Sequence, residues 1–383
     1  MVFIMACKPH LSFVIVDFRV GGAEKVLLNL VKALSPHYRI EIIALFDDGE
    51  YFDDYQKAAS VTVLKSIRKL PGNIKKTVRY LMLRFWKYVP TCLVSRAYIQ
   101  QSDLLVAYLE GIPTRLVSQV KGIAKVAWVH IDPVAFPYSQ KYFPSFRHEV
   151  EAYQSMDQVI CVSKGVQAQF ASRFTSIHST CVLHNLLDEK DIIESAAVRS
   201  FQSMNSRKQF LMIGKLMPQK GIDRCLLALC RLERKDWDLH IIGTGELQAE
   251  LEHLVRQLSL ADQVHFHGYQ AFPWSCLKQV DCLISSSWAE GYSTVIAEAR
   301  ILHCPVLSTK TAGSEELVEH GVNGYLCDNS TEGLTAALKH LSHHNWTLLS
   351  HIQKGAETSV YSQHDVLEQT LHLFQQLIDK EGV

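Results

Sequence analysis

The stretch 282–298, CLISSSWAEGYSTVIAE, combines an apolar run with a glycine turn and the start of a helix. Residues 282–285 have the length and apolar character of a buried strand. Gly291 permits a sharp turn after that strand, and Ser293 or Thr294 can cap the helix that follows. A strand that passes through such a turn into a helix is the repeating unit of a parallel sheet, so this stretch predicts an α/β fold.

The same alternation of strand and helix patterns continues along the chain in both directions. The runs predicted to form strands are 11–16, 40–45, 104–108, 125–129, 158–162, 181–183, 210–213, 239–242, 264–266, 282–285 and 305–308. Helical periodicity is found at 23–34, 222–232, 247–258 and 366–378. Parallel sheets with helical connections are therefore expected on both sides of the polar segment 188–206.

The polar segment predicts the division into domains. It has no strand pattern and is expected to be a linker with a helical piece. We predict two Rossmann-like domains, at 1–187 and 188–360. The terminal helix, within 361–383, is expected to pack back on the first domain.

The composition fits two globular domains and excludes several other classes. The chain has 383 residues, of which 48% are hydrophobic and 20% charged. Its 39 basic and 39 acidic residues cancel, which does not favour a nucleic-acid partner. Ten cysteines without a Cys-x-x-Cys pair are typical of reduced, buried thiols rather than a zinc site. The apolar run 11–16 reads as a first strand rather than a signal peptide, and no transmembrane helix is expected.

Two carboxylates, Glu290 and Glu298, flank the start of the helix in the opening stretch. Glu290 is expected in the loop and Glu298 in the second turn, so that both can accept hydrogen bonds from sugar or ribose hydroxyls. The helix N-terminus between them offers N–H groups to a phosphate. The alternative is a solvated helix with two ordinary surface acids.

Three further strand-to-helix turns contain candidate binding residues. Lys215 and Lys220, in the loop 214–221, suit a diphosphate, although a basic loop without a ligand is the alternative. Gly21-Gly22 lets a ligand approach the backbone. The Gly-x-Gly turn at 243–245 lacks the third glycine of the dinucleotide fingerprint, which counts against a dehydrogenase.

A histidine, His130, directly follows the predicted strand 125–129. Ligands bind at the carboxyl ends of strands in such folds, so His130 is a candidate site residue. A single histidine in this position also occurs as an ordinary structural residue.

Taken together and in this order, these motifs resemble those of the retaining glycosyltransferases of family 4, which have the GT-B fold. The resemblance covers nearly the whole chain. Asn185 and Asp188 are similar to the ends of the family's Asn-Gly-Val-Asp segment between domains, with Leu186 and Leu187 as the middle pair. The resemblance implies two Rossmann-like domains with parallel sheets that face each other across a cleft. It also implies that the domain at 1–187 binds the acceptor and the domain at 188–360 binds the nucleotide sugar.

The resemblance also implies roles for the charged residues. Glu298 is similar to the carboxylate that holds the ribose hydroxyls, and Glu290 to the one that contacts the donor sugar. Lys220 resembles the lysine that binds the diphosphate. Lys215 stands where the family usually has arginine, and lysine lacks the bidentate fork that arginine offers to phosphate.

The catalytic set implied by the resemblance is His130, Glu290 and Lys220, with His130 similar to the histidine that contacts the donor sugar. The other implied donor-binding residues are Gly21, Gly22, Gly214, Lys215, Gly243, Gly268, Tyr269, Gly291, Tyr292, Ser293, Thr294, Val295 and Glu298.

The resemblance implies a hexosyltransferase that retains anomeric configuration. The donor is a nucleotide sugar, with UDP favoured over GDP. The acceptor is a glycan or a polyprenyl-linked glycan of a bacterial surface polysaccharide such as O-antigen, capsule or lipopolysaccharide. Because lysines and a helix N-terminus can stabilise the leaving diphosphate, we expect neither a metal site of the Asp-x-Asp type nor another cofactor.

Two other functions remain open from the sequence. A nucleotide-sugar epimerase of the same architecture would bind a similar donor without an acceptor. An inactive partner subunit would be marked by the loss of Glu298 or Lys220, and both are present.

The chain between Asp54 and Asp103 contains basic residues and no acidic residue. Aromatic residues lie between its cations, as in a helix at the surface of an anionic membrane. The expected membrane residues are Lys75, Lys76, Arg79, Arg84, Phe85 and Trp86. This pattern predicts a cytoplasmic protein associated with the inner face of the cell membrane, whereas the alternative is a solvated face over a core helix.

Overall fold

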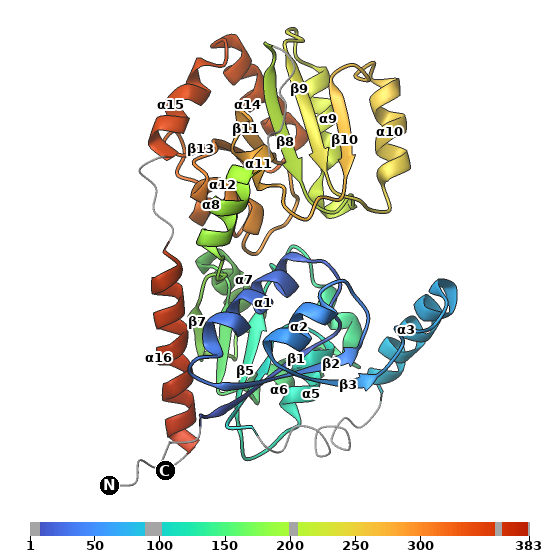
Figure 1. Ribbon diagram of the computed structural model, residues 1–383, viewed down its shortest axis with the longest axis vertical. Helices are drawn as coiled ribbons and strands as arrows, with labels where there is room; N and C mark the ends of the chain where they lie inside the picture. Colours follow the sequence, from blue (N-terminus) through green and yellow to red (C-terminus); the bar gives the residue numbers. More distant parts are fainter. Residues whose placement is uncertain (1–7, 89–101, 199–205, 357–361, 382–383) are drawn as a thin grey trace. The chain divides into compact units, whose positions relative to one another are not determined.

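The computed structural model describes residues 8–88, 102–198, 206–356 and 362–381 (Figure 1). The chain forms two compact units. The first contains the described residues up to Leu186 and those from Gln363 onward, and the second runs from Leu187 to Ser362. Each unit has one parallel sheet with helices, so the predicted class of two Rossmann-like α/β domains is confirmed.

The sheet of the first unit has the strand order β3-β2-β1-β4-β5-β6-β7. Its strands are β1 (His10–Ile15), β2 (Arg39–Phe46), β3 (Ser60–Lys65), β4 (Leu104–Ala107), β5 (Ala124–Val129), β6 (Gln158–Cys161) and β7 (Thr180–Val182). Its helices are α1 (Gly22–Leu34), α2 (Phe52–Ala58), α3 (Gly72–Trp86), α5 (Ile112–Ser118), η1 (Tyr138–Tyr142), α6 (Phe146–Gln154), α7 (Lys164–Arg173) and α16 (Gln363–Glu381).

The sheet of the second unit has the strand order β10-β9-β8-β11-β12-β13. Its strands are β8 (Lys208–Ile213), β9 (Trp237–Ile242), β10 (Val264–Gly268), β11 (Cys282–Ser285), β12 (Val306–Thr309) and β13 (Gly324–Cys327). Its helices are α8 (Glu189–Val198), η2 (Pro218–Lys220), α9 (Ile222–Cys230), α10 (Gln248–Gln257), α11 (Trp274–Leu277), α12 (Thr294–Ile301), α13 (Ser314–Leu317), α14 (Thr331–His343) and α15 (Thr347–Ala356).

Both faces of the second sheet are buried, which explains the continuous apolar runs of its strands. In β8, Phe210 and Met212 join the core that α9, α10 and α14 close. Leu211, between them, is also fully buried but lies outside that core, on the opposite face. A strand buried on both faces favours an unbroken apolar run over alternation.

In each sheet, the order of strands along the chain reverses beside the first strand. The reversal lies between β1 and β4 in the first unit and between β8 and β11 in the second. Open α/β sheets bind ligands outside the carboxyl ends of the strands at such a reversal. The loops after β8 and β11 are therefore the first place to look for a site.

The structure departs from the predicted elements at two sheet edges. The edge strands β3 and β13 were not predicted, because half or more of their residues are only partly buried and leave a weaker apolar pattern. The helical piece predicted within the polar segment is confirmed, since α8 lies there. Ile192 and Ala196 of α8 are buried, and the helix packs on α11 and α12 within the second unit. Among the described residues, no helix is long and apolar enough to span a membrane.

Helix α16 belongs to the first unit although it follows the second in the sequence (Figure 1). It packs on α1, β4 and β5. Phe374 is fully buried there, with its ring centroid 6.4 Å from that of Phe13 and 6.5 Å from that of Tyr38. The terminal helix thus completes the core of the first unit.

Replacement of Phe374 by alanine should lower the free energy of unfolding of the first unit by about 3–5 kcal/mol, because it leaves a cavity in a closed core. Phe85→Ala is the matched control, since that ring is 59% exposed and its loss should change stability by less than about 0.5 kcal/mol. Urea unfolding read by hydrogen exchange of β1 and β4 peptides measures both. Equal losses would show that α16 does not contribute a core residue.

Candidate active site

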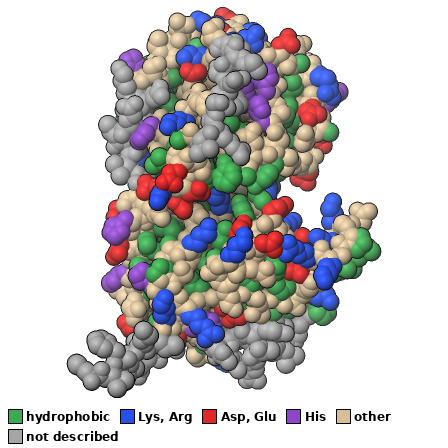
Figure 2. Space-filling view, in the orientation of Figure 1, with side chains coloured by type: hydrophobic (Ala, Val, Ile, Leu, Met, Phe, Trp, Pro, Cys, Tyr) green, Lys and Arg blue, Asp and Glu red, His purple; other side chains and the backbone are tan. Residues whose placement is uncertain are grey.

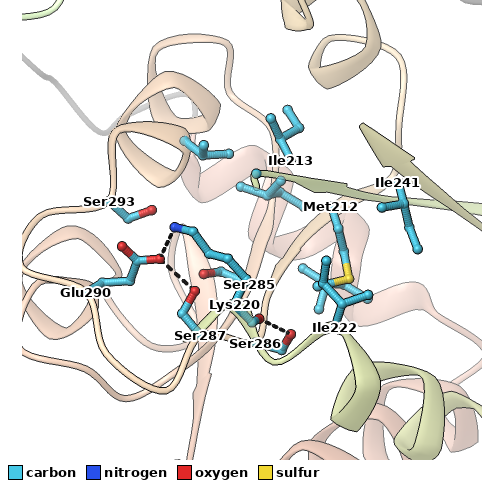
Figure 3. A pocket seen from close by; sticks show the side chains of 14 residues that line it. Met212, Ile213, Lys220, Ile222, Ile241, Ser285, Ser286, Ser287, Glu290 and Ser293 are labelled. Carbon is cyan, nitrogen blue, oxygen red and sulfur yellow. Dashed lines mark hydrogen bonds and ion pairs between the residues drawn. The ribbon is translucent and has the colours of Figure 1, made fainter. Parts of the chain in front are cut away.

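A pocket in the second unit opens at the carboxyl ends of β8 and β11 (Figure 3). Apolar residues from β8, β9 and β11 form its floor, and the loops after β8 and β11 form its polar wall. Five of the predicted donor-binding residues line it: Gly214, Lys220, Glu290, Ser293 and Val295. The pocket therefore lies where the strand order reverses, as expected for a ligand site in an open α/β sheet.

An ion pair joins the two charged residues of this pocket. The ammonium nitrogen of Lys220 lies 2.5 Å from Oε1 of Glu290, and the hydroxyl of Ser287 donates to the same oxygen at 2.6 Å. In Figure 3 the two charged side chains point toward each other from opposite loops. The pocket thus presents a cation and a carboxylate side by side.

The loop that carries Lys220 depends on the glycine that follows it. Gly221 has a φ of 58°, and a Cβ there would lie 2.4 Å from the carbonyl oxygen of Ser286. The hydroxyl of Ser286 donates to the carbonyls of Lys220, at 3.1 Å, and Gly221, at 2.8 Å. Only glycine lets the two loops approach this closely, which explains the Lys-Gly pair in the sequence.

The Gly-x-Gly turn after β9 supports the same loop from the other side. Gly243 has a φ of 143°, and a Cβ there would lie 1.9 Å from the carbonyl oxygen of Gly214. The backbone N–H of Leu216 donates to Thr244 at 3.0 Å. Gly243 therefore acts by close packing against the loop after β8, and it does not line the pocket.

Helix α12 starts at the pocket and carries the second carboxylate. The side chain of Ser293 caps the helix by accepting from the N–H of Ile296 at 3.4 Å. Glu298 lies in the second turn and is only 8% exposed. A solvated helix with two surface acids is thereby excluded, because Glu298 is buried and Glu290 is paired in the pocket.

The remaining predicted residues of the second unit lie outside the lining of the pocket. Gly291, Tyr292, Thr294 and Glu298 belong to α12 and the turn before it, whereas Gly268 ends β10 and Tyr269 follows it. Tyr269 is 53% exposed. Lys215 is exposed to solvent and does not line the pocket. The structure thus separates Lys215 from Lys220, which the sequence placed together.

One Asp-x-Asp triplet, Asp236-Trp237-Asp238, is present, contrary to expectation. It lies at the amino end of β9, at the other end of the strand from the pocket. Asp236 pairs with Arg234 at 2.5 Å and Asp238 with Arg207 at 3.1 Å. Both carboxylates therefore serve as ion-pair partners near the start of the strand.

His130 lies at the carboxyl end of β5 in the first unit. Its ring stacks 6.0 Å from that of Trp128 and lies 4.5 Å from the ring of Tyr108. Burial lowers the pKa of His130 to about 3, although a hydrogen bond to the Tyr108 backbone opposes the shift. His130 is therefore neutral at physiological pH and can offer a hydrogen bond but no charge.

A buried carboxylate that the sequence analysis missed holds the loop of His130. Oε1 of Glu110 accepts hydrogen bonds from the backbone N–H groups of His130, at 2.7 Å, and Ile131, at 3.0 Å. The hydroxyl of Tyr138 donates to its other oxygen at 3.3 Å. Glu110 follows β4, the neighbour of β5, so the rule that located His130 at a strand end would have located it too.

The paired glycines of the first unit lie at the start of α1. Gly21 is the N-terminal cap in an extended conformation, and Gly22 is the first helical residue. A Cβ on Gly21 would lie 2.1 Å from a carboxylate oxygen of Glu24. The carboxylate of Glu24 therefore occupies the space beside Gly21 that a side chain at that position would need.

Helix α3 carries the residues predicted to bind membrane, and the structure corrects three of them. Lys75 pairs with Asp48 at 2.9 Å, and Arg79 pairs with Asp17 at 2.6 Å. Trp86 is only 6% exposed. All three side chains face the body of the unit, where Lys75 and Arg79 attach the helix to the loops after β2 and β1.

The outward face of α3 is apolar with basic neighbours (Figure 2). Four large apolar residues with a helical spacing are exposed there: Ile74, Leu81 and Phe85 within the helix and Tyr88 just beyond its end. Their exposed fractions are 52%, 57%, 59% and 70%, respectively. Lys76 and Arg84 are also exposed. We call these six residues the α3 face. A later part of the basic stretch, residues 89–101, lies outside the described residues.

Comparison with known proteins identifies the fold and the class. The chain aligns with the crystal structure of HepE from Anabaena in complex with UDP and glucose, with a TM-score of 0.73 and 20% identity, over 95% of this chain and 99% of that one. It is 25% identical to a Campylobacter jejuni N-acetylgalactosamine-N,N'-diacetylbacillosaminyl-diphospho-undecaprenol 4-alpha-N-acetylgalactosaminyltransferase, over 82% of this chain and 84% of that one. It is 23% identical to the lipopolysaccharide core biosynthesis glycosyltransferase LpsE of Rhizobium meliloti, over 89% and 91%.

The chain is therefore a glycosyltransferase with the GT-B fold. Residues 196–358, which include the pocket and α12, match the model of the family described as glycosyl transferases group 1. This part of the chain is thus similar to that family, in agreement with the resemblance read from its motifs.

The carboxyl of Glu110 should give the first unit a distinctive pH dependence. Burial raises its pKa to about 7 from 4.5, despite the hydrogen bonds from His130 and Ile131 that oppose the shift. Because the folded state binds this proton more tightly than the unfolded state, the stability that the proton provides is complete below pH 4.5. That stability is lost as the pH rises through 7.

Unfolding of wild-type protein in urea between pH 4.5 and 7.5, followed on peptides of β4 and β5, should show this loss. Glu110→Gln should flatten the profile, since an amide keeps the acceptor oxygen without titrating. Glu151→Gln is the control, because Glu151 is exposed and pairs only with Arg147 on the same helix. Identical pH profiles for wild type and Glu110→Gln would show that Glu110 does not titrate in this range.

Proposed function

We propose that this protein transfers a sugar from a nucleotide sugar, preferentially a UDP-sugar, and retains the anomeric configuration. The observation that carries the proposal is the pair formed by Lys220 and Glu290 in a pocket at the strand reversal, beside the N-terminus of α12. The similarity to HepE, whose structures contain UDP with glucose and UDP-glucose, supports a UDP donor. In this arrangement, the nucleotide belongs to the second unit.

The leaving nucleoside diphosphate develops negative charge as the glycosidic bond breaks. The ammonium of Lys220 and the N–H groups at the start of α12 stabilise that charge. Glu290 then accepts hydrogen bonds from the donor sugar, and buried Glu298 from the ribose. Front-face attack, in which the departing phosphate assists deprotonation of the acceptor, accounts for retention.

His130 contributes as a neutral group in this proposal. Its low pKa leaves the ring uncharged, so it positions a sugar hydroxyl by hydrogen bonding rather than by donating a proton. Glu110 fixes the backbone of His130 and Ile131 and thereby the direction of the ring. Cations of the protein take the place of a metal, and no other cofactor takes part.

We propose a polyprenyl-linked or other glycan acceptor of surface polysaccharide synthesis. Two relatives support this proposal: the C. jejuni enzyme is named for a diphospho-undecaprenol substrate, and LpsE for lipopolysaccharide core biosynthesis. A lipid-linked acceptor requires access to a membrane surface. The α3 face offers that access in the first unit, because exposed apolar side chains next to cations favour an anionic bilayer interface.

Lys220→Ala should reduce release of nucleoside diphosphate by about 10²–10³-fold, the usual effect of losing one charge-stabilising donor. The assay uses a panel of UDP- and GDP-sugars with lipid-linked glycan acceptors, in the presence of EDTA. Lys278→Ala is the matched control, since it removes an exposed lysine of the same unit outside the pocket.

Turnover in Lys220→Ala at the wild-type rate would exclude the pocket as the diphosphate site. Loss of wild-type activity in EDTA, restored by Mg²⁺ or Mn²⁺, would exclude the metal-free mechanism. Conversion of the donor into another nucleotide sugar without free diphosphate would identify an epimerase instead. Donor binding without any product would identify an inactive partner subunit.

Wild-type protein should sediment with vesicles that contain anionic lipid and should be released by high salt. Lys76→Gln with Arg84→Gln should weaken partitioning about 30-fold, since each cation near the surface contributes about 1 kcal/mol. Leu81→Ser with Phe85→Ser should weaken binding in a salt-independent way. The charge-matched control is Lys57→Gln with Arg147→Gln, which removes two exposed cations that lie outside α3. Equal binding by all variants would rule out the α3 face.

A further inference from the structure

A buried arginine lies behind the wall of the pocket. Arg224, in the first turn of α9, is only 1% exposed. No carboxylate of the described residues forms an ion pair with it, and its Nη1 atom is buried without a hydrogen-bond partner. A buried cation without a counter-ion is costly, so its presence calls for an explanation beyond core packing.

The contacts of Arg224 converge on the loop after β11. Its Nε atom donates to the carbonyl of Ser286 at 2.7 Å, and its guanidinium carbon lies 3.7 Å from the ring centroid of Trp288. Its Nη2 atom donates to Thr309 at 3.2 Å and to Asn329 at 2.8 Å. Through this one side chain, α9 is joined to the ends of β11, β12 and β13.

The two acceptors of Nη2 extend the network to the next carbonyls of the loop. The hydroxyl of Thr309 donates to the carbonyl of Ser287 at 2.8 Å. The side-chain amide of Asn329 donates to the carbonyl of Trp288 at 2.9 Å. Three consecutive carbonyls, from Ser286 to Trp288, are therefore bound directly by Arg224 or through a residue that accepts from it.

Two other contacts complete this arrangement. The carbonyl of Ala289 accepts from the side chain of Gln219 at 2.8 Å, and the carbonyl of Glu290 accepts from the N–H of Gly313 at 3.0 Å. With every carbonyl from Ser286 to Glu290 bound, the loop has little freedom to rotate. The side chain of Glu290 is thereby directed to Lys220 in the pocket.

We propose that Arg224 is a positioning residue for donor binding, which fixes the 286–290 loop against the loop that carries Lys220. The proposal rests on the assignment of the pocket as the nucleotide-sugar site. Arginine is required because the planar fork reaches the Ser286 carbonyl and both Nη2 acceptors at once, and its flat face stacks on Trp288. Lysine retains the charge but cannot make these contacts together.

Arg224→Lys should raise the Kd of UDP about tenfold, the effect of losing one hydrogen bond from a charged group. Asn329→Ala should raise it about threefold. Asn329→Ala keeps the proposal testable if Arg224→Lys does not fold, because it removes an exposed side chain and leaves the core intact. Both should speed amide exchange in the 286–290 loop. Arg231→Lys, at the other end of α9 with an exposed partner in Glu332, is the matched control.

Calorimetric titration measures the UDP affinity of the folded variants, and hydrogen-exchange mass spectrometry measures amide exchange in the 286–290 loop. A fall in melting temperature with unchanged UDP affinity and unchanged loop exchange would assign Arg224 to core stability alone and overturn the proposal. If wild-type protein bound neither UDP nor GDP, the pocket assignment would be wrong and the role of Arg224 would fail with it. If wild-type protein bound UDP and the variants bound it with the same affinity, the pocket assignment would stand and only the positioning role of Arg224 would be wrong.

Discussion

The site depends on the hydrogen bonds between Ser286 and the carbonyls of Lys220 and Gly221. These bonds connect the loops that follow two adjacent strands, β8 and β11, at the point where the order of the sheet reverses. Without a close approach here, Lys220 and Glu290 would lie on separate loops with no fixed distance between them. Gly221 makes the approach possible because it has no side chain to separate the backbones. Arg224 then fixes the 286–290 loop by a hydrogen bond to the carbonyl of Ser286.

The fold was largely predictable because parallel strands buried on both faces leave a continuous apolar signature, as in β8. Edge strands such as β3 lack that signature, and the helix within the polar segment, α8, was predicted without its packing. Its packing partners α11 and α12 come about 80 to 100 residues later, and no local pattern reveals such contacts.

The sequence predicted which residue types lie at the site, but it did not predict the direction in which each side chain points. Spacing located Lys220 and Glu290, since strand ends and glycine turns are visible in the sequence. It could not show that Lys75 and Arg79 turn toward Asp48 and Asp17, because those partners are distant in the chain. Glu110 was missed for a related reason. The strand-end rule could have selected it, but the hydrogen bonds that it accepts come from the loop after β5, and no local pattern reveals them.

The return of α16 to the first unit has a consequence for biosynthesis. A ribosome releases the chain from the N-terminus, so the first unit emerges without the helix that covers Phe13 and Tyr38. The second unit, continuous from Leu187 to Ser362, can complete its fold as soon as it leaves the exit tunnel. The unit that is translated first is therefore the last to close, because its apolar surface is not covered until α16 has been synthesised.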